Sequence, residues 1–249
     1  MSEVRNSFSE PFLPLLTAPA TAVRKQPSYI KGHRSRLRQR FREGGADAMP
    51  DYEILELMLF RSHKQADTKP IAHALLKEFG TIGGVLAAPI SRLITVPDVG
   101  TATALDLKII EAAGHRMMRT KVLNKPVLSS WDALLDYCHA VMSNRDTEHF
   151  RVLFLDRKNT LIADEILGQG TVDHVPVYPR EVARRAIELS ASALILLHNH
   201  PSGDPTPSQP DILMTAKIQT LCDAMDIALH DHLIIGKGRE VSFRSEGLL

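Results

Sequence analysis

The sequence predicts an α+β or α/β fold, in which an all-helical N-terminal domain precedes a mixed sheet flanked by helices. Three observations lead to this prediction. Up to about residue 120, apolar residues recur only at helical spacing, whereas strand-like runs and helical patterns alternate after residue 131. The continuous apolar run at 193–197, bounded by loop residues, is typical of a fully buried strand.

Length and composition are those of an ordinary globular protein, with 249 residues, 44% apolar and 24% charged. The net charge of +1 predicts no strong overall field, so nucleic-acid binding would have to come from local clusters. The two cysteines, Cys138 and Cys222, lie far apart in helical patterns, which indicates a reducing compartment without disulfides or a cysteine metal site. No membrane span or signal peptide is recognisable, so we expect a cytoplasmic protein without a membrane partner. Its oligomeric state is left open.

Four segments are predicted along the chain. Residues 1–28 are rich in Ser, Pro, Thr and Ala without a period, which predicts a disordered tail. Residues 29–120 form the helical domain. Residues 121–130, with a proline and two serines, are the predicted linker, and residues 131–249 form the second domain.

The first predicted helix is strongly basic. Residues 31–42 carry six cations and no acid, with Lys31, Arg34, Arg38 and Arg42 as candidate nucleic-acid contacts. The ordinary alternative, a solvated helix face at a domain edge, is the one we favour. Asp51 is the predicted N-cap of the next helix. A further helix is predicted over 68–79, with its end at Gly80.

The second domain alternates between helices and strands. After a helix over 131–142, the pattern predicts a strand at 150–155 and a return strand at 160–167, which Gly168 and Gly170 break. A further strand is predicted within 172–178, before a helix over 180–190. The buried strand at 193–197 and a helix over 208–225 follow, and a hairpin of 233–235 with 240–243 ends the chain.

The stretch from Ala193 to Asp211 predicts a metal site. Residues two apart in extended chain point to the same side, so His198 and His200 can face one point while Asn199 turns away. Ser208 is the expected N-cap of the next helix, whose first turn carries Asp211. Two imidazoles and one carboxylate suit one Zn2+ per chain and leave an open fourth position, as catalytic zinc requires.

Two histidine pairs have less specific alternatives. His198 and His200 could be polar residues of a turn, but the proline-rich loop and the acid at the helix start argue against this. His230 and His232 form a second His-x-His pair around Asp231. Strand-edge packing is the expected role of this second pair, and contact with the substrate or with the metal ligands is the alternative.

The same residues carry a resemblance to known families. His198-Asn-His200-Pro followed by Ser208-x-x-Asp211 resembles the JAMM metalloprotease motif. The wider sequence resembles the bacterial RadC family in Gly32–Arg38, Glu43–Ala46, Tyr178–Glu181, His198–Gly203 and Asp231–Gly236. The resemblance implies a helical N-terminal region and a C-terminal JAMM/MPN-like domain, related to the cytidine-deaminase fold. It also implies that His198, His200 and Asp211 are the metal ligands.

JAMM enzymes also use an upstream glutamate as general base. Glu148, two residues before the strand at 150–155, matches best in position, with Glu165 and Glu181 as competitors. The resemblance implies that Ser208 stabilises the tetrahedral intermediate, and a pure N-cap is the alternative. The implied reaction is hydrolysis of an amide or isopeptide bond in a protein or peptide substrate. The residue between the two histidines is commonly Ser or Thr in such peptidases and is Asn199 here.

A second resemblance points to DNA. Residues 93–104 resemble the turn of a helix-hairpin-helix module, whose backbone N–H groups bind a phosphate. Asp98 replaces the first glycine of that turn, and its carboxylate would repel a phosphate. A hairpin used only for packing is the alternative. The corresponding functional alternative is a DNA-associated repair or recombination accessory protein whose JAMM domain is a binding scaffold.

Overall fold

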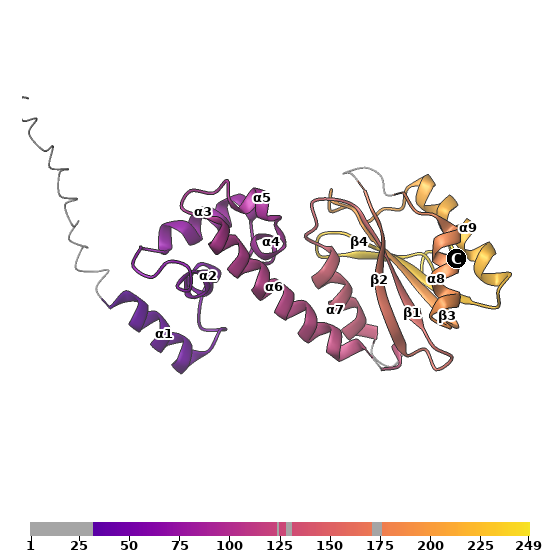
Figure 1. Ribbon diagram of the computed structural model, residues 1–249, viewed down its shortest axis with the longest axis horizontal. Coiled ribbons are helices and arrows are strands. Elements are labelled where there is room, and N and C mark those ends of the chain that lie inside the picture. Colours follow the sequence, from indigo (N-terminus) through magenta and orange to yellow (C-terminus); the bar gives the residue numbers. More distant parts are fainter. Residues whose placement is uncertain (1–31, 124, 128–130, 171–175) are drawn as a thin grey trace, which may run out of the picture. The chain divides into compact units, whose positions relative to one another are not determined.

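Helices come first in the described chain and a mixed sheet follows, so the predicted α+β fold is confirmed (Figure 1). The computed structural model describes residues 32–123, 125–127, 131–170 and 176–249. The helices are α1 (His33–Gly44), α2 (Asp51–Leu59), α3 (Lys69–Phe79), α4 (Ile82–Ala87), α5 (Ile90–Leu93), α6 (Thr101–Val122), α7 (Trp131–Met142), α8 (Pro179–Glu188) and α9 (Gln209–Asp223). The strands are β1 (His149–Leu155), β2 (Leu161–Gln169), β3 (Ala193–Asn199), β4 (Ala228–Ile235) and β5 (Glu240–Ser242).

Two arginines of the basic helix α1 contact neighbouring residues of the helical region. Arg34 donates hydrogen bonds to the carbonyl oxygens of His63 and Ala66. The guanidinium carbons of Arg34 and Arg38 lie 4.5 Å and 5.4 Å from the centre of the Phe60 ring. A cation above an aromatic ring is a stabilising contact. Both arginines therefore help to pack α1 against Phe60 and the residues that follow it.

The prediction that Asp51 caps α2 is wrong by one position. Pro50 occupies the N-cap position with extended backbone, and Asp51 is the first helical residue. A proline readily precedes a helix because its ring fixes φ, and the Asp51 carboxylate lies in the first turn, where the helix dipole favours negative charge.

The turn before α6 has one residue in the conformation that glycine favours. Asp98 has a φ of 63°, in the left-handed region where glycine is usual. Aspartate tolerates this region better than most other residues, so it can replace the glycine without changing the turn. Gly100 then takes the N-cap position of α6.

The five strands form one sheet in the order β2-β1-β3-β4-β5. β1 runs antiparallel to β2 and β3, β3 and β4 are parallel, and β5 returns antiparallel to β4. Helix α7 covers one face, and α8 and α9 cover the other (Figure 1). The central strand β3 is buried along its whole length, as predicted for the apolar run. Its end therefore opens at the rim of a sheet covered on both faces.

Three strand predictions need correction. Gly168 does not break β2, because it pairs with Phe150 inside the ladder. Residues 176–178 form no strand, and the rest of the strand predicted within 172–178 lies outside the described residues. β4 begins at Ala228 rather than at Leu233, so both histidines of the second pair lie inside a strand. His230, Asp231 and His232 interrupt the apolar pattern of β4, so the continuous apolar run that predicted the strand begins only at Leu233.

Among the described residues, no helix combines the length and the apolar character that a membrane crossing requires.

Candidate metal centre

The end of β3 delivers two histidines to one point. His198 is the last residue of β3 that pairs with β1, opposite Phe150, and it is 1% exposed. His200 follows the strand, yet its backbone N–H still donates to the Ile235 carbonyl of β4 at 3.1 Å. Both imidazoles are thus fixed by strand pairing, with ring centres 4.8 Å apart.

The loop after His200 lies tightly against the end of β4. A Cβ atom on Gly236 would come within 2.4 Å of the Gly203 carbonyl oxygen, so this contact needs a glycine. The Lys237 N–H donates to the same oxygen at 3.1 Å. On the other side of the loop, Nδ1 of His200 lies 2.7 Å from the Asp204 carbonyl oxygen. The loop therefore sets the orientation of the second imidazole.

The start of α9 supplies the carboxylate through a capping box, which confirms Ser208 as the N-cap. The Ser208 N–H donates to Asp211 Oδ2 at 2.8 Å, and the Asp211 N–H donates to the Ser208 hydroxyl at 3.3 Å. The single proton of that hydroxyl also goes to Asp211 Oδ2, at 2.5 Å. Asp211 is thereby held in place by the helix that carries it.

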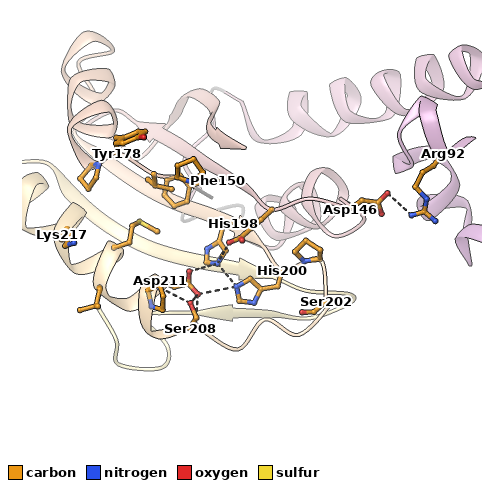
Figure 2. A pocket seen from close by; sticks show the side chains of 18 residues that line it. Arg92, Asp146, Phe150, Tyr178, His198, His200, Ser202, Ser208, Asp211 and Lys217 are labelled. Carbon is orange, nitrogen blue, oxygen red and sulfur yellow. Dashed lines mark hydrogen bonds and ion pairs between the residues drawn. The ribbon is translucent and has the colours of Figure 1, made fainter. Parts of the chain in front are cut away.

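Glu148 completes a four-residue cluster with His198, His200 and Asp211. One ligand atom from each lies within 4.8 Å of all the others. Nε2 of His198 is 3.4 Å from Asp211 Oδ1 and 3.9 Å from Glu148 Oε1, and Nε2 of His200 is 3.6 Å from Asp211 Oδ2. Figure 2 shows the imidazoles and the Asp211 carboxylate pointing toward one another. The cluster is compatible with a metal site.

A chain of hydrogen bonds assigns the tautomer of His198. The Thr215 hydroxyl gives its proton to the Asp211 carbonyl oxygen at 2.6 Å, so it accepts from Nδ1–H of His232 at 2.6 Å. Burial lowers the pKa of His232 well below its usual value, so this imidazole is neutral. Its Nε2 therefore accepts from Nδ1–H of His198 at 2.8 Å. In neutral His198, the form that binds a metal, Nε2 therefore carries a lone pair that faces the cluster.

His200 has the same arrangement, because the carbonyl beside its Nδ1 can only accept. The two Nε2 atoms then face each other at 2.9 Å, with carboxylate oxygens around them. In the protonated imidazoles each Nε2 carries a proton instead: burial by itself raises the pKa of Asp211, but the hydrogen bonds that both histidines then donate outweigh it and hold that pKa well below its usual range. The hydrogen bond with Asp211 also raises the pKa of His200, against burial. In the neutral imidazoles a cation can bridge the converging lone pairs in place of those protons, and a divalent metal is compatible with this donor set.

Comparison with known proteins agrees with this geometry. Residues 128–248 match the family of the RadC-like JAB domain. A UPF0758 protein of Ruegeria pomeroyi is 65% identical over 223 residues, which cover 90% of this chain and all of that protein. A UPF0758 protein of Rhodobacter capsulatus is 66% identical over 213 residues, which cover 86% of this chain and all of the relative. The chain belongs to the UPF0758 family. The RadC resemblance read from the sequence is confirmed.

In this UPF0758 protein the cluster opens into a cleft of about 1140 Å³. Glu148, His198, His200, Ser208 and Asp211 all line it. Apolar residues form much of the remaining lining. Figure 2 shows Tyr178 and Phe150 on the side of the cleft opposite Ser208 and Asp211. The lining of the cleft includes Pro176, Val177, Tyr178, Leu213, Met214 and Lys217. A concave site with few converging polar groups is the usual form of a substrate site.

The competing glutamates lie outside the cluster of the UPF0758 protein. Glu165 pairs with Arg185 at 2.6 Å, and hydrogen bonds from that arginine lower its pKa. Glu181 pairs with Arg184 at 3.0 Å. Of the three candidates for general base, Glu148 is the one next to the histidines. Lys31 lies outside the described residues, and Arg34, Arg38 and Arg42 of α1 do not belong to the cluster.

Two residues outside the cluster support the candidate metal ligands. For His232, strand-edge packing was the expected role and contact with the metal ligands the alternative; it is fully buried and bonded to His198, so the alternative is the one observed. Thr215 was not singled out at all. A signal for Thr215 existed, because it lies four residues after Asp211 on the same helix face. The His232 contact depends on the pairing of β3 with β4, which no local pattern reveals.

Proposed function

We propose that this UPF0758 protein is a zinc-dependent hydrolase that cleaves an amide bond, peptide or isopeptide, in a protein or peptide substrate. The observation that supports it best is the complete set of Glu148, His198, His200 and Asp211 at the floor of an open cleft. Three of them form the ligand set of a catalytic zinc, which keeps one position open. The fourth is a carboxylate within reach of that position.

His198, His200 and Asp211 would hold the zinc. Bound there, it would polarise the substrate carbonyl and lower the pKa of a water molecule. Glu148 takes the proton from the attacking water and later gives it to the leaving amine. Its carboxylate is suited to this because its Oε1 lies 3.9 Å from Nε2 of His198, close to the ligands but not among the hydrogen bonds of the capping box.

Ser208 has one proton for two tasks. In the structure that proton goes to Asp211. A role in stabilising the oxyanion requires the hydroxyl to redirect its proton toward the substrate as negative charge develops. The capping box keeps a second bond to Asp211 from the Ser208 backbone N–H, so the helix start stays held meanwhile.

The test compares the zinc-loaded protein with its Glu148→Gln variant in a cell extract, with new peptide termini and released amines identified by mass spectrometry. We expect cleavage products that depend on Glu148, while both proteins contain the same amount of zinc by metal analysis. Loss of the general base typically costs about 10²- to 10⁴-fold in rate. Identical products from both proteins, or no products from either, would overturn the proposal.

The second candidate function is DNA association through the helical region. It is favoured by the exposed Arg42 of α1 and by the N-terminal turn of the 22-residue helix α6, which no described side chain caps, while the Asp98 carboxylate before that helix opposes a phosphate contact. The full-length protein can be titrated with duplex DNA at several salt concentrations. Phosphate contacts give an affinity that falls steeply with salt, and Arg42→Gln should lower the slope by about one. A flat response would exclude this function.

A further inference from the structure

The side chain of Asn199 turns away from the two ligand histidines that flank it and contacts the segment that carries Glu148. It is 1% exposed. Its Oδ1 accepts from the His149 N–H at 2.9 Å, and its Nδ2 donates to the Thr147 carbonyl oxygen at 3.1 Å. We propose that Asn199 is a positioning residue that holds Glu148 at the metal cluster. This inference rests on the proposed role of Glu148 as general base.

Glu148 needs such support because it lies where the ladder between β1 and β3 stops. The last pair of that ladder joins Phe150 to His198, and β1 itself begins only at His149. From there on, the Asn199 amide takes the place of strand pairing. On the opposite side, the Glu148 carbonyl oxygen accepts from the Gly170 N–H at 2.9 Å. The peptide groups on both sides of Glu148 are therefore fixed.

The contact requires an amide side chain. One partner is a backbone donor and the other a backbone acceptor, and asparagine offers an acceptor oxygen and a donor nitrogen in one plane. An aspartate of the same shape could accept from His149 but could not donate to Thr147. A serine is shorter and has a single polar atom. The amide at this position thus matches the backbone it contacts, although Ser or Thr is common there in related peptidases.

This arrangement ties the metal ligands to the base. The backbone of Asn199 belongs to β3 and pairs with Ile235 of β4, so its side chain has a rigid origin. The same three residues then present two imidazoles to the metal and one amide to the backbone on either side of Glu148. A misplacement of about 1 Å in a catalytic group can cost on the order of 10²-fold in rate. Loss of the amide should consequently affect the rate of the chemical step rather than metal binding.

The test uses Asn199→Ser and Asn199→Asp, each in the native background and combined with Glu148→Gln. The assay substrate is one whose cleavage requires Glu148. We expect kcat to fall by about 10- to 100-fold in either single variant, with KM changed less than about threefold. Zinc content and the visible spectrum of the cobalt-loaded protein should stay unchanged. In the Glu148→Gln background, the Asn199 substitutions should cause no further loss.

A measurement without turnover accompanies it. Hydrogen exchange of the His149 amide should be about ten times faster in Asn199→Ser, because its acceptor is gone. Unchanged exchange, or an equal loss of rate with and without Glu148, would overturn the positioning role. A native protein that is no faster than Glu148→Gln would instead overturn the proposed hydrolase, and the role of Asn199 in it. Native activity that needs Glu148 but tolerates Asn199→Ser would overturn the positioning role alone.

Discussion

Two His-x-His tripeptides lie in neighbouring parallel strands, and only one of them forms a pair of candidate metal ligands. At the end of β3, the Nε2 atoms of His198 and His200, the residue after the strand, lie 2.9 Å apart. In β4, His232 contacts His198, whereas His230 contacts Asn159 in the turn between β1 and β2. The same spacing therefore produces a shared site in one strand and two separate contacts in the next.

A bulge explains the difference. The pairing of β3 with β4 shifts by one residue between Leu194–Leu229 and Ile195–Asp231, so His230 is an extra residue in β4. A bulge interrupts the alternation of side chains between the two faces. His232 consequently packs against Thr215 of α9, while His230 and Asp231 line a cleft beside Trp131 on the other face. Spacing of two predicts a common side only in a regular strand.

The largest expected effect separates the two pairs directly. His198→Ala should lose the bound metal and with it at least about 10³-fold of hydrolysis, because a ligand and the metal's several kcal/mol of catalysis are removed. His230→Ala is the matched control and should keep both. Metal analysis of the purified variants and an activity assay check this. Equal metal loss in both variants would mean that the bulge does not separate the two pairs.

A smaller effect on zinc binding is expected for His232, which bonds Nδ1 of the candidate ligand His198. His232→Leu removes the acceptor for Nδ1–H of His198 and should weaken zinc binding by about 10- to 100-fold, as is typical for such supporting residues. His230→Leu again serves as the control. Competition with a chromophoric chelator measures both affinities. An unchanged affinity in His232→Leu would show that the tautomer of His198 needs no fixing.

The sequence predicts the parts of this comparison that depend on neighbours in the chain. Local signals predict the buried strand that leads into His198 and the N-cap of Ser208 before Asp211. The structure has both. The bulge at His230 and the contact between His149 and Asn199 have no such signal. They join residues that are far apart in sequence, 50 residues in the second case, and depend on strand register.

Glu148, the proposed general base, combines a residue chosen by resemblance with a contact that depends on strand pairing. No spacing rule singles out Glu148 from Glu165 and Glu181, and its choice came from family resemblance alone. The structure brings it to the cluster through the pairing of β1 with β3. The strand predicted within 172–178 can be compared only at residues 176–178, where no strand forms. Val177 packs against the apolar cluster around Phe150, so a strand-like local pattern can also serve a buried side chain outside the sheet.

The third candidate ligand, Asp211, is held by the N-cap residue Ser208, whose role can be tested. Ser208→Ala removes the side-chain half of the capping box and should cost about 1 kcal/mol in the free energy of unfolding. If the hydroxyl also donates to the oxyanion, kcat should fall by about 10²-fold as well. Ser208→Gly, which serves as an N-cap at a cost of only about a few tenths of a kcal/mol and has no side-chain proton to donate, should restore most of the stability without restoring kcat. Urea unfolding and steady-state kinetics separate the two roles, and recovery of both by glycine would reduce Ser208 to a cap.

The smallest effect concerns the apolar cluster that includes Phe150, whose ring centre lies 6.0 Å from that of His232. Cys222 of α9 is buried in the same apolar cluster as Phe150 and Leu194. Burial, followed by the nearby Asp223 charge, raises the pKa of its thiol to about 11. Since only the thiolate reacts, alkylation at pH 8 should be about 10²-fold slower than for an exposed thiol with an ordinary pKa of 9.0, and faster as the pH rises toward 11.

This labelling rate tells apart two explanations for a weakened site in His232→Leu. If only the hydrogen bond to His198 is lost, α9 stays packed and Cys222 reacts as slowly as in the native protein. If this apolar cluster loosens, Cys222 becomes accessible and reacts at a rate close to that of the unfolded chain. A slow rate together with weak zinc binding therefore assigns the loss to the tautomer of His198. A fast rate would assign it to packing, and the contrast between the two histidine pairs would then reflect core stability rather than metal chemistry.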